Sequence, residues 1–60
     1  MGDPGELLTV REIAKGLKLS TTFVWREIKA GALPTIRLGR SVRVTRADLD
    51  AYIKARRESR

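Results

Sequence analysis

The sequence has 60 residues, and 13 Lys and Arg against seven Asp and Glu give a formal net charge of +6. A chain this short buries only about 60% of its unfolded surface, which leaves no room for a deep substrate cavity beside a core. It has no Cys and no His, so the usual thiolate, zinc, acid–base and triad chemistry is excluded, and we expect no metal, no cofactor and no enzymatic activity. No apolar run approaches the roughly 20 residues of a membrane span. These features indicate a soluble, intracellular binding module for a polyanion, with no membrane partner.

The excess positive charge lies in one short segment. Residues 37–47 contain four arginines and no acid, whereas residues 1–36 hold five basic and four acidic side chains. The four arginines recur at every third position, as Arg37, Arg40, Arg43 and Arg46. This spacing predicts one surface that binds phosphate groups, and the alternative is an ordinary solvated basic face.

A helix is predicted after a short leader. Residues 1–6 are rich in Gly and Pro, so we expect them to form a loose leader. Thr9 and Glu12 have the spacing of a capping box, and apolar residues then recur at helical spacing as far as Leu17. A first helix is therefore expected to begin after Thr9.

A second helix follows after only two or three residues. Ser20 is its predicted N-cap, the helix runs over about residues 21–30, and Gly31 ends it. The short connection predicts a helix-turn-helix, in which the two helices pack at a steep angle. If Lys18 adopts the left-handed backbone conformation in this turn, the strain relative to Gly is about 1–2 kcal/mol.

A β-hairpin is predicted after Leu33 and Pro34. Residues 36–38 and 42–44 alternate apolar and charged side chains, which is the pattern of two short strands. A three-residue loop would keep the apolar side chains on one face and place Arg37 opposite Arg43. A two-residue loop would mix the two faces, so the pattern favours the three-residue loop. The commonest loop of that length has its glycine last, whereas here it comes first.

A third helix completes the expected order. Thr45 is its predicted N-cap with Asp48 as the partner, and the helix is expected to fray from Arg56 onward. Helix, turn, helix, hairpin and helix make a mainly α fold with a short β-hairpin, which is a winged helix-turn-helix. We divide the chain into a flexible leader (residues 1–6), the winged helix-turn-helix DNA-binding domain (residues 7–57) and a frayed tail (residues 58–60).

The second helix presents an outward face to a partner. Steps of 100° per residue turn Val24 and Ile28 toward the core and leave a polar stripe opposite them. The residues of this helix expected to bind DNA are Ser20, Thr21, Thr22, Trp25, Arg26 and Lys29. Short hydroxyls and N–H groups at a helix start suit phosphates or base edges, and Arg suits bidentate contact with guanine. Ser20 is alternatively a plain N-cap, and Trp25 either borders the DNA or fills the groove against the hairpin.

The hairpin is expected to be a second DNA-binding element, the wing. Its candidate residues are Arg37, Arg40, Ser41 and Arg43. Like charges directly opposite each other destabilise a hairpin, but they become useful when an anion lies between them, as in a minor groove. Arg40 at the tip is expected to reach furthest. Alternatively, the arginines only protect the hairpin edge from aggregation.

The stretch from Gly31 to Arg40 reads G-x-L-P-x-x-R-L-G-R and joins the second helix to the hairpin. Together with the capped helices around it, from about residue 7 to residue 54, it resembles the excisionase family of MerR-like winged helix-turn-helix domains. These include the recombination directionality factors of phages and mobile elements. The chain differs from the usual residues of this family at Lys18, where Gly is common, at Thr21, where a basic residue is common, and at Trp25, where Tyr is common.

The resemblance implies sequence-directed binding to double-stranded DNA, with the second helix in the major groove and the wing on the minor groove. Excisionases bind and bend attachment-site DNA in the bacterial cytoplasm, at the nucleoid, often as cooperative neighbours. They help an integrase to excise a prophage and catalyse nothing themselves. The family also contains transcriptional regulators, which would bind an operator in a promoter. Because the sequence ends soon after the third helix, we expect the architectural role. A module that binds protein or membrane surfaces, and not DNA, is the remaining alternative.

Overall fold

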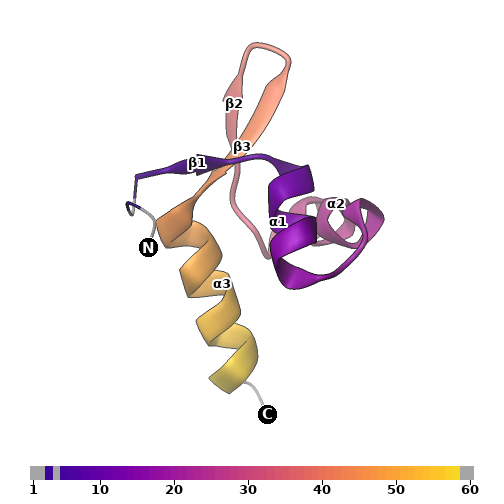
Figure 1. Cartoon of the computed structure of the whole chain (residues 1–60), viewed down its shortest axis with the longest axis vertical. Helices are drawn as coiled ribbons and strands as arrows, with labels where there is room; N and C mark the ends of the chain where they lie inside the picture. The colour runs from indigo at the N-terminus through magenta and orange to yellow at the C-terminus, as the bar shows by residue number, and fades with distance from the viewer. Residues whose placement is uncertain (1–2, 4, 59–60) are drawn as a thin grey trace.

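The computed structural model describes residue 3 and residues 5–58 (Figure 1). The elements in chain order are β1 (Leu7–Leu8), α1 (Val10–Leu17), α2 (Thr21–Lys29), β2 (Ile36–Leu38), β3 (Ser41–Thr45) and α3 (Arg46–Glu58). Figure 1 shows the β2–β3 hairpin projecting away from the helices, with α1 and α2 together on one side and α3 on the other. Three helices with a small antiparallel sheet form a small winged helix-turn-helix domain, which confirms the predicted fold class.

All three predicted helix caps are formed. At α1, the Glu12 N–H donates to Thr9 Oγ1 over 3.0 Å, and the Thr9 N–H donates to Glu12 Oε1 over 2.8 Å, so the capping box is complete. Ser20 Oγ accepts from the backbone N–H three residues later at 3.1 Å. Thr45 Oγ1 accepts from the Asp48 N–H, also at 3.1 Å. Each cap satisfies a backbone donor that the first turn of its helix leaves without a partner.

The turn between α1 and α2 is built on a left-handed lysine. Lys18 has φ 59° and ψ 40°, which is the left-handed conformation considered for it in the sequence. Its N–H donates to the Lys15 carbonyl at 3.2 Å, and the Leu19 N–H donates to the Ala14 carbonyl at 2.8 Å. This pair of bonds is a Schellman motif, which satisfies carbonyls at the end of α1 and offsets part of the strain.

The sheet contains a strand that the sequence did not predict. The strand order is β1-β3-β2, and β1 pairs antiparallel with β3 through Leu7 opposite Thr45 and Leu8 opposite Val44. The Glu6 carbonyl, assigned to the loose leader, accepts from the Arg46 N–H at 2.8 Å. Two residues carry no readable alternation, so only their pairing with β3 identifies them as a strand. The rest of the leader at positions 1–2 and 4 lies outside the described residues.

The predicted register of the hairpin is wrong. Leu38 pairs with Ser41, Arg37 with Val42, and Ile36 with Arg43, so the loop has only two residues and Ser41 begins β3. Gly39 occupies the first loop position with φ 62°. That is the place of glycine in a type II′ turn, whose twist matches that of the flanking strands.

This register places apolar and charged side chains on the same face of the hairpin, which argued against it, but the arrangement costs little stability here. All three residues of β2 are exposed, because the hairpin extends beyond the helices. Alternation specifies register only where one face is buried. On β3 the only fully enclosed side chain is Val44, which lies next to β1 and away from the hairpin tip.

The core is small and draws on every helix. Its buried residues are Val10, Ile13, Ala14, Val24, Leu33, Val44 and Leu49, with Leu8, Leu17, Ile28, Tyr52 and Ile53 packed around them. Val24 of α2 is only 2% exposed, so the inner side of this helix is anchored while its outer side remains free. The core therefore determines which face of α2 is presented to a partner.

The end of α3 is more ordered than expected. The helix extends to Glu58, although fraying was predicted from Arg56. The Arg56 guanidinium lies over the Tyr52 ring, 4.9 Å from its centroid, and bonds to the Glu27 carboxylate on α2. These contacts attach the last turns of α3 to the rest of the domain. Residues 59–60 of the predicted tail lie outside the described part of the chain.

Candidate nucleic-acid interface

A groove of about 470 Å³ separates the hairpin from the N-terminal ends of α1 and α2. The groove is lined by Thr9, Val10, Arg11, Thr21, Trp25, Arg40, Ser41, Val42 and Arg43. Five of the ten residues predicted to bind DNA are in this lining, namely Thr21, Trp25, Arg40, Ser41 and Arg43. The fold thus brings the second helix and the wing together as two walls of one basic groove.

The outward stripe of α2 has the predicted orientation. Thr22, Arg26 and Lys29 are all exposed, on the side of the helix away from buried Val24. They are not part of the groove lining. A helix with one anchored face and one exposed polar face has the shape that fits a major groove.

The two residues at the start of α2 differ in role. Ser20 is exposed, and its hydroxyl forms the N-cap by accepting from the Phe23 N–H. Helical steps turn the next residue, Thr21, partly toward the core, yet it is exposed and lines the groove. The first turn of α2 is less covered than an ideal helical projection suggests, because the hairpin stands away from it across the groove.

The two aromatic residues of α2 lie on opposite flanks of the helix. Trp25 is 40% exposed and lines the groove together with Arg40 and Val42. Phe23 is half-buried and lines a different groove, against Leu17, Leu19 and the C-terminal half of α3. Trp25 therefore lies in the groove against the hairpin with part of its ring exposed, and its contact with DNA stays a prediction.

The wing arginines do not form the expected facing pair. Directly opposite residues share a face of a hairpin, so Arg37 shares a face with Val42, and Arg43 shares the other face with Ile36. Arg37 is exposed and lies outside the groove lining, whereas Arg40 is exposed at the loop and lines the groove. The like-charge pair that was predicted to hold an anion is thus absent from the hairpin, and the reason is the two-residue loop.

Arg43 has structural contacts of its own. It is half-buried, and its Nη1 donates to the Val42 carbonyl at 2.9 Å. Hydrogen bonds with the Thr9 backbone and side chain lower the pKa of Glu12, and the charge of Arg43 lowers it further. Arg43 therefore lies close to the capping box of α1, and its charge complements the carboxylate there.

Arg11 is a groove residue that the sequence did not predict. It lies in the first turn of α1 and lines the groove with Arg40 and Arg43. In the sequence nothing distinguishes it from Lys15, another exposed cation of the same helix. Only the packing of α1 against the hairpin separates the two, because it directs the first turn of α1 toward the wing.

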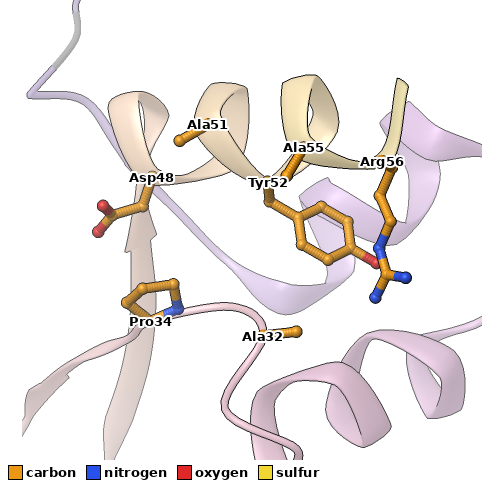
Figure 2. A pocket seen from close by; sticks show the side chains of 7 residues that line it. All are labelled: Ala32, Pro34, Asp48, Ala51, Tyr52, Ala55 and Arg56. Atoms are coloured by element: carbon orange, nitrogen blue, oxygen red, sulfur yellow. The ribbon is translucent and has the colours of Figure 1, made fainter. Parts of the chain in front are cut away.

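A polar cluster supports α2 from the side of α3. The Tyr52 hydroxyl donates to Glu27 Oε1 at 2.6 Å, and burial and this hydrogen bond both raise the pKa of Tyr52. Figure 2 shows Tyr52 and Arg56 next to each other on α3, facing a second hollow of about 400 Å³. That hollow is lined by Ala32, Pro34, Asp48, Ala51, Tyr52, Ala55 and Arg56. Its walls are mostly small and apolar, in contrast to the arginine-lined groove beside the wing.

Neither a metal centre nor a membrane helix is found among the residues that the structure describes. No group of three or more acidic, His or Cys side chains comes together there in a way that could hold a metal ion. Within the same residues, no helix is both long enough and apolar enough to cross a membrane.

Comparison with known proteins identifies the family. The profile of a helix-turn-helix domain family matches residues 7–57. The chain is 46% identical over 39 residues, which are 65% of this chain and 50% of each relative, to two Mycobacterium tuberculosis proteins named "Putative DNA-binding protein Rv0500A" and "Putative DNA-binding protein MT0521". It is also 46% identical over 44 residues, 73% of this chain and 14% of the relative, to the "Uncharacterized protein YvgK" of Bacillus subtilis. The chain thus spans half of the length of these relatives or less. No solved structure matches the chain significantly. Since the family profile covers most of the sequence, the chain belongs to this family of helix-turn-helix domains.

Proposed function

We propose that the chain binds double-stranded DNA in a sequence-directed manner, with α2 in the major groove and the hairpin on the adjacent minor groove. The observation that carries this proposal is the groove between α2 and the wing. It gathers Arg11, Arg40 and Arg43 beside the exposed face of α2. Membership of the helix-turn-helix family and the names of the M. tuberculosis relatives support DNA as the partner.

The exposed face of α2 reads the bases in this proposal. Arg26 suits bidentate contact with guanine, and Thr22 and Lys29 lie on the same exposed stripe. Ser20 and Thr21 stand at the helix start, where backbone N–H groups and the helix dipole favour phosphate. These residues orient the helix in the groove, and the base contacts of the stripe set the preferred sequence.

The wing supplies charge on several sides. Arg40 at the two-residue loop enters the minor groove, where the negative potential attracts arginine. Arg37 and Arg43 lie on opposite faces of the hairpin, so they contact different phosphates. Ser41 and Trp25 line the groove between the wing and α2, where the sugar–phosphate backbone of one strand would run. The two walls of the groove thus hold one DNA strand between them.

The biological role that we propose is that of an excisionase. The protein would bind and bend an attachment site in the bacterial cytoplasm, at the nucleoid, with cooperative neighbours. It would assist an integrase without catalysing a reaction itself. This role is supported by the resemblance of residues 7–54 to excisionases. A small regulator that binds a promoter operator is the alternative, because the same groove and α2 stripe would serve it equally well.

Salt-dependent gel shifts test the binding proposal directly. About five phosphate contacts give a slope near −4.5 when log K is plotted against log salt concentration. Replacing Arg26 with Ala is expected to weaken specific binding and relax discrimination between sites, by about 1–3 kcal/mol for a lost bidentate pair. Lys15→Ala is the matched control, because Lys15 is an exposed cation of α1 that belongs neither to the exposed stripe of α2 nor to the groove lining. A flat salt response by the unaltered protein would contradict DNA binding.

Excision is tested with the integrase and attachment sites of the mobile element that carries the gene. We expect the purified chain to raise the yield of excised DNA, and to protect attachment-site DNA in footprints. If it instead changes the output of a promoter reporter in a strain without the recombinase, and leaves excision unchanged, the regulator is the correct role. Binding to lipid vesicles or a protein that survives Arg26→Ala and Arg40→Ala would point to the third alternative.

A further inference from the structure

Among the described residues, Leu38 has the most exposed large apolar side chain, at 51%. It is the last residue of β2, immediately before the Gly39–Arg40 loop at the tip of the hairpin. Figure 1 shows this tip standing well clear of the three helices. No part of the core can cover Leu38 there, so its side chain contributes little to the fold.

The register explains why the neighbouring residues also leave Leu38 open. The residue directly opposite is Ser41, whose small side chain offers little apolar contact. Ile36 lies two residues earlier on the same face and is itself 37% exposed. The tip therefore presents a narrow apolar edge within a segment, residues 37–47, that carries four arginines.

The charges around this edge indicate an anionic partner. Arg37 and Arg40 flank Leu38 in the sequence, and no carboxylate occurs between Glu27 and Asp48. Ser41, opposite Leu38, lines the basic groove beside α2. The apolar edge thus adjoins the surface that we propose for DNA. A polyanion with a stacked apolar interior, a DNA duplex, offers partners for both the arginines and the leucine.

The dimensions of the minor groove favour contact through the tip. The groove is only about 6 Å wide in undistorted DNA. The two strands of a hairpin are already about 5 Å apart before their side chains are added. The hairpin therefore enters only by its tip, or by widening the groove. Proteins that widen it commonly insert Leu, Ile or another apolar side chain between two base pairs and kink the duplex.

We propose that Leu38 is such a wedge, inserted from the minor groove between two stacked base pairs so that the duplex bends away from the wing. This inference rests on the proposed function, because it assigns one residue to the bending of bound DNA. Arg40 holds the phosphate or groove floor next to the kinked step. Pyrimidine–purine steps unstack most easily, so the wedge acts preferentially at such a step under the tip.

The test compares Leu38→Ala with Ile36→Ala, its matched control on the same face of the hairpin and two pairs further from the tip. Bending is measured by circular permutation and by energy transfer between dyes at the two duplex ends. Local unstacking is measured with 2-aminopurine placed at successive positions under the wing. We expect Leu38→Ala to lose at least half of the bend and the fluorescence increase, whereas Ile36→Ala retains both. We expect Leu38→Ala to change the affinity for DNA by less than about 10-fold. The variant loses the contacts of the wedge with the bases, but it also avoids the free-energy cost of unstacking them.

The possible failures are distinguishable. If the unaltered chain does not bind DNA, the proposed function itself fails. If it binds without bending, or if Leu38→Ala bends and unstacks DNA as the unaltered chain does, the wedge is overturned while DNA binding stands. Leu38→Ala removes no charge, so its salt slope should equal that of the unaltered chain. Thermal unfolding provides the folding control, and an exposed residue outside the core should leave it unchanged.

Discussion

The hydroxyl of Tyr52 on α3 donates a 2.6 Å hydrogen bond to Oε1 of Glu27 on α2. The same oxygen accepts from Arg56, which lies over the Tyr52 ring. The Glu27 side chain is only 14% exposed, so this carboxylate is held in a largely enclosed place. The cluster joins α2 to α3 on a side that does not line the wing groove. It fixes the helix whose outer stripe we propose to contact the bases.

Tyr52→Phe is expected to destabilise the domain by about 1–2 kcal/mol, because it removes a half-buried hydrogen bond to a charged acceptor. Urea denaturation measures the change in the free energy of unfolding. Tyr52 has its pKa raised above its ordinary value of 10.0, so its contribution is present below that pH and is lost as the pH rises through the higher folded-state value. The stability gap between the two proteins should therefore narrow in alkaline solution. A gap that is unchanged at high pH would contradict the role of this hydroxyl.

Lys18→Gly is expected to stabilise the domain by about 0.5–1 kcal/mol. The left-handed conformation of Lys18 costs a residue with a side chain about 1–2 kcal/mol, and the greater freedom of Gly in the unfolded chain offsets part of the gain. Lys18→Ala is the control, because it removes the same charge and keeps the strain. The midpoints of thermal unfolding should rank Gly above both Ala and Lys. Equal midpoints for the Gly and Ala variants would show that the turn stores no strain.

Glu12 makes stability depend on acid pH. Its pKa lies below its ordinary value of 4.5, through the hydrogen bonds of the capping box and the charge of Arg43. The folded state thus binds a proton less readily than the unfolded state, so the contribution is present above about pH 4.5 and disappears as the pH falls through the lower folded-state value. The advantage of the native chain over Glu12→Gln should shrink between pH 6 and pH 3, as measured by denaturation. An advantage that stays constant over this pH range would contradict the role of the Glu12 carboxylate.

Arg11 provides a prediction about DNA that the linear sequence does not suggest. If the DNA strand between wing and α2 contacts Arg11, then Arg11→Ala reduces the magnitude of the log–log salt slope by about 0.9, the value for one phosphate contact. Lys15→Ala, one helical turn further along α1, should leave the slope unchanged. Both variants remove one exposed cation, so equal slopes would mean that only net charge matters and that the groove does not hold the strand.

Structural features that depend on residues only a few positions apart could be predicted from the sequence. The caps at Thr9, Ser20 and Thr45 each depend on a side chain and a backbone N–H three residues apart. The end of α2 depends on Gly31, which has φ 81°. Such pairs are close in the unfolded chain as well, so their geometry does not depend on the rest of the fold. For that reason the helices, their order and the exposed stripe of α2 were predictable.

The hairpin and the groove depended on contacts between distant segments. Alternation of apolar and polar side chains predicts the register only where the core covers one face of a strand. Only the packing of the helices shows that β2 lies outside the core. β1 becomes a strand only by pairing with β3, and Arg11 becomes a groove residue only because α1 packs beside the wing.

The sequence by itself determined the capped helices, the presence of a hairpin and a basic segment of four arginines, because each rests on local geometry or composition. The tertiary structure decided which arginines share a face, which cations meet across the groove and why Leu38 is left open at the tip. These relationships are set by which surfaces the small core covers. Which surfaces the core covers depends on contacts throughout the packed chain, so no local pattern in the sequence reveals it.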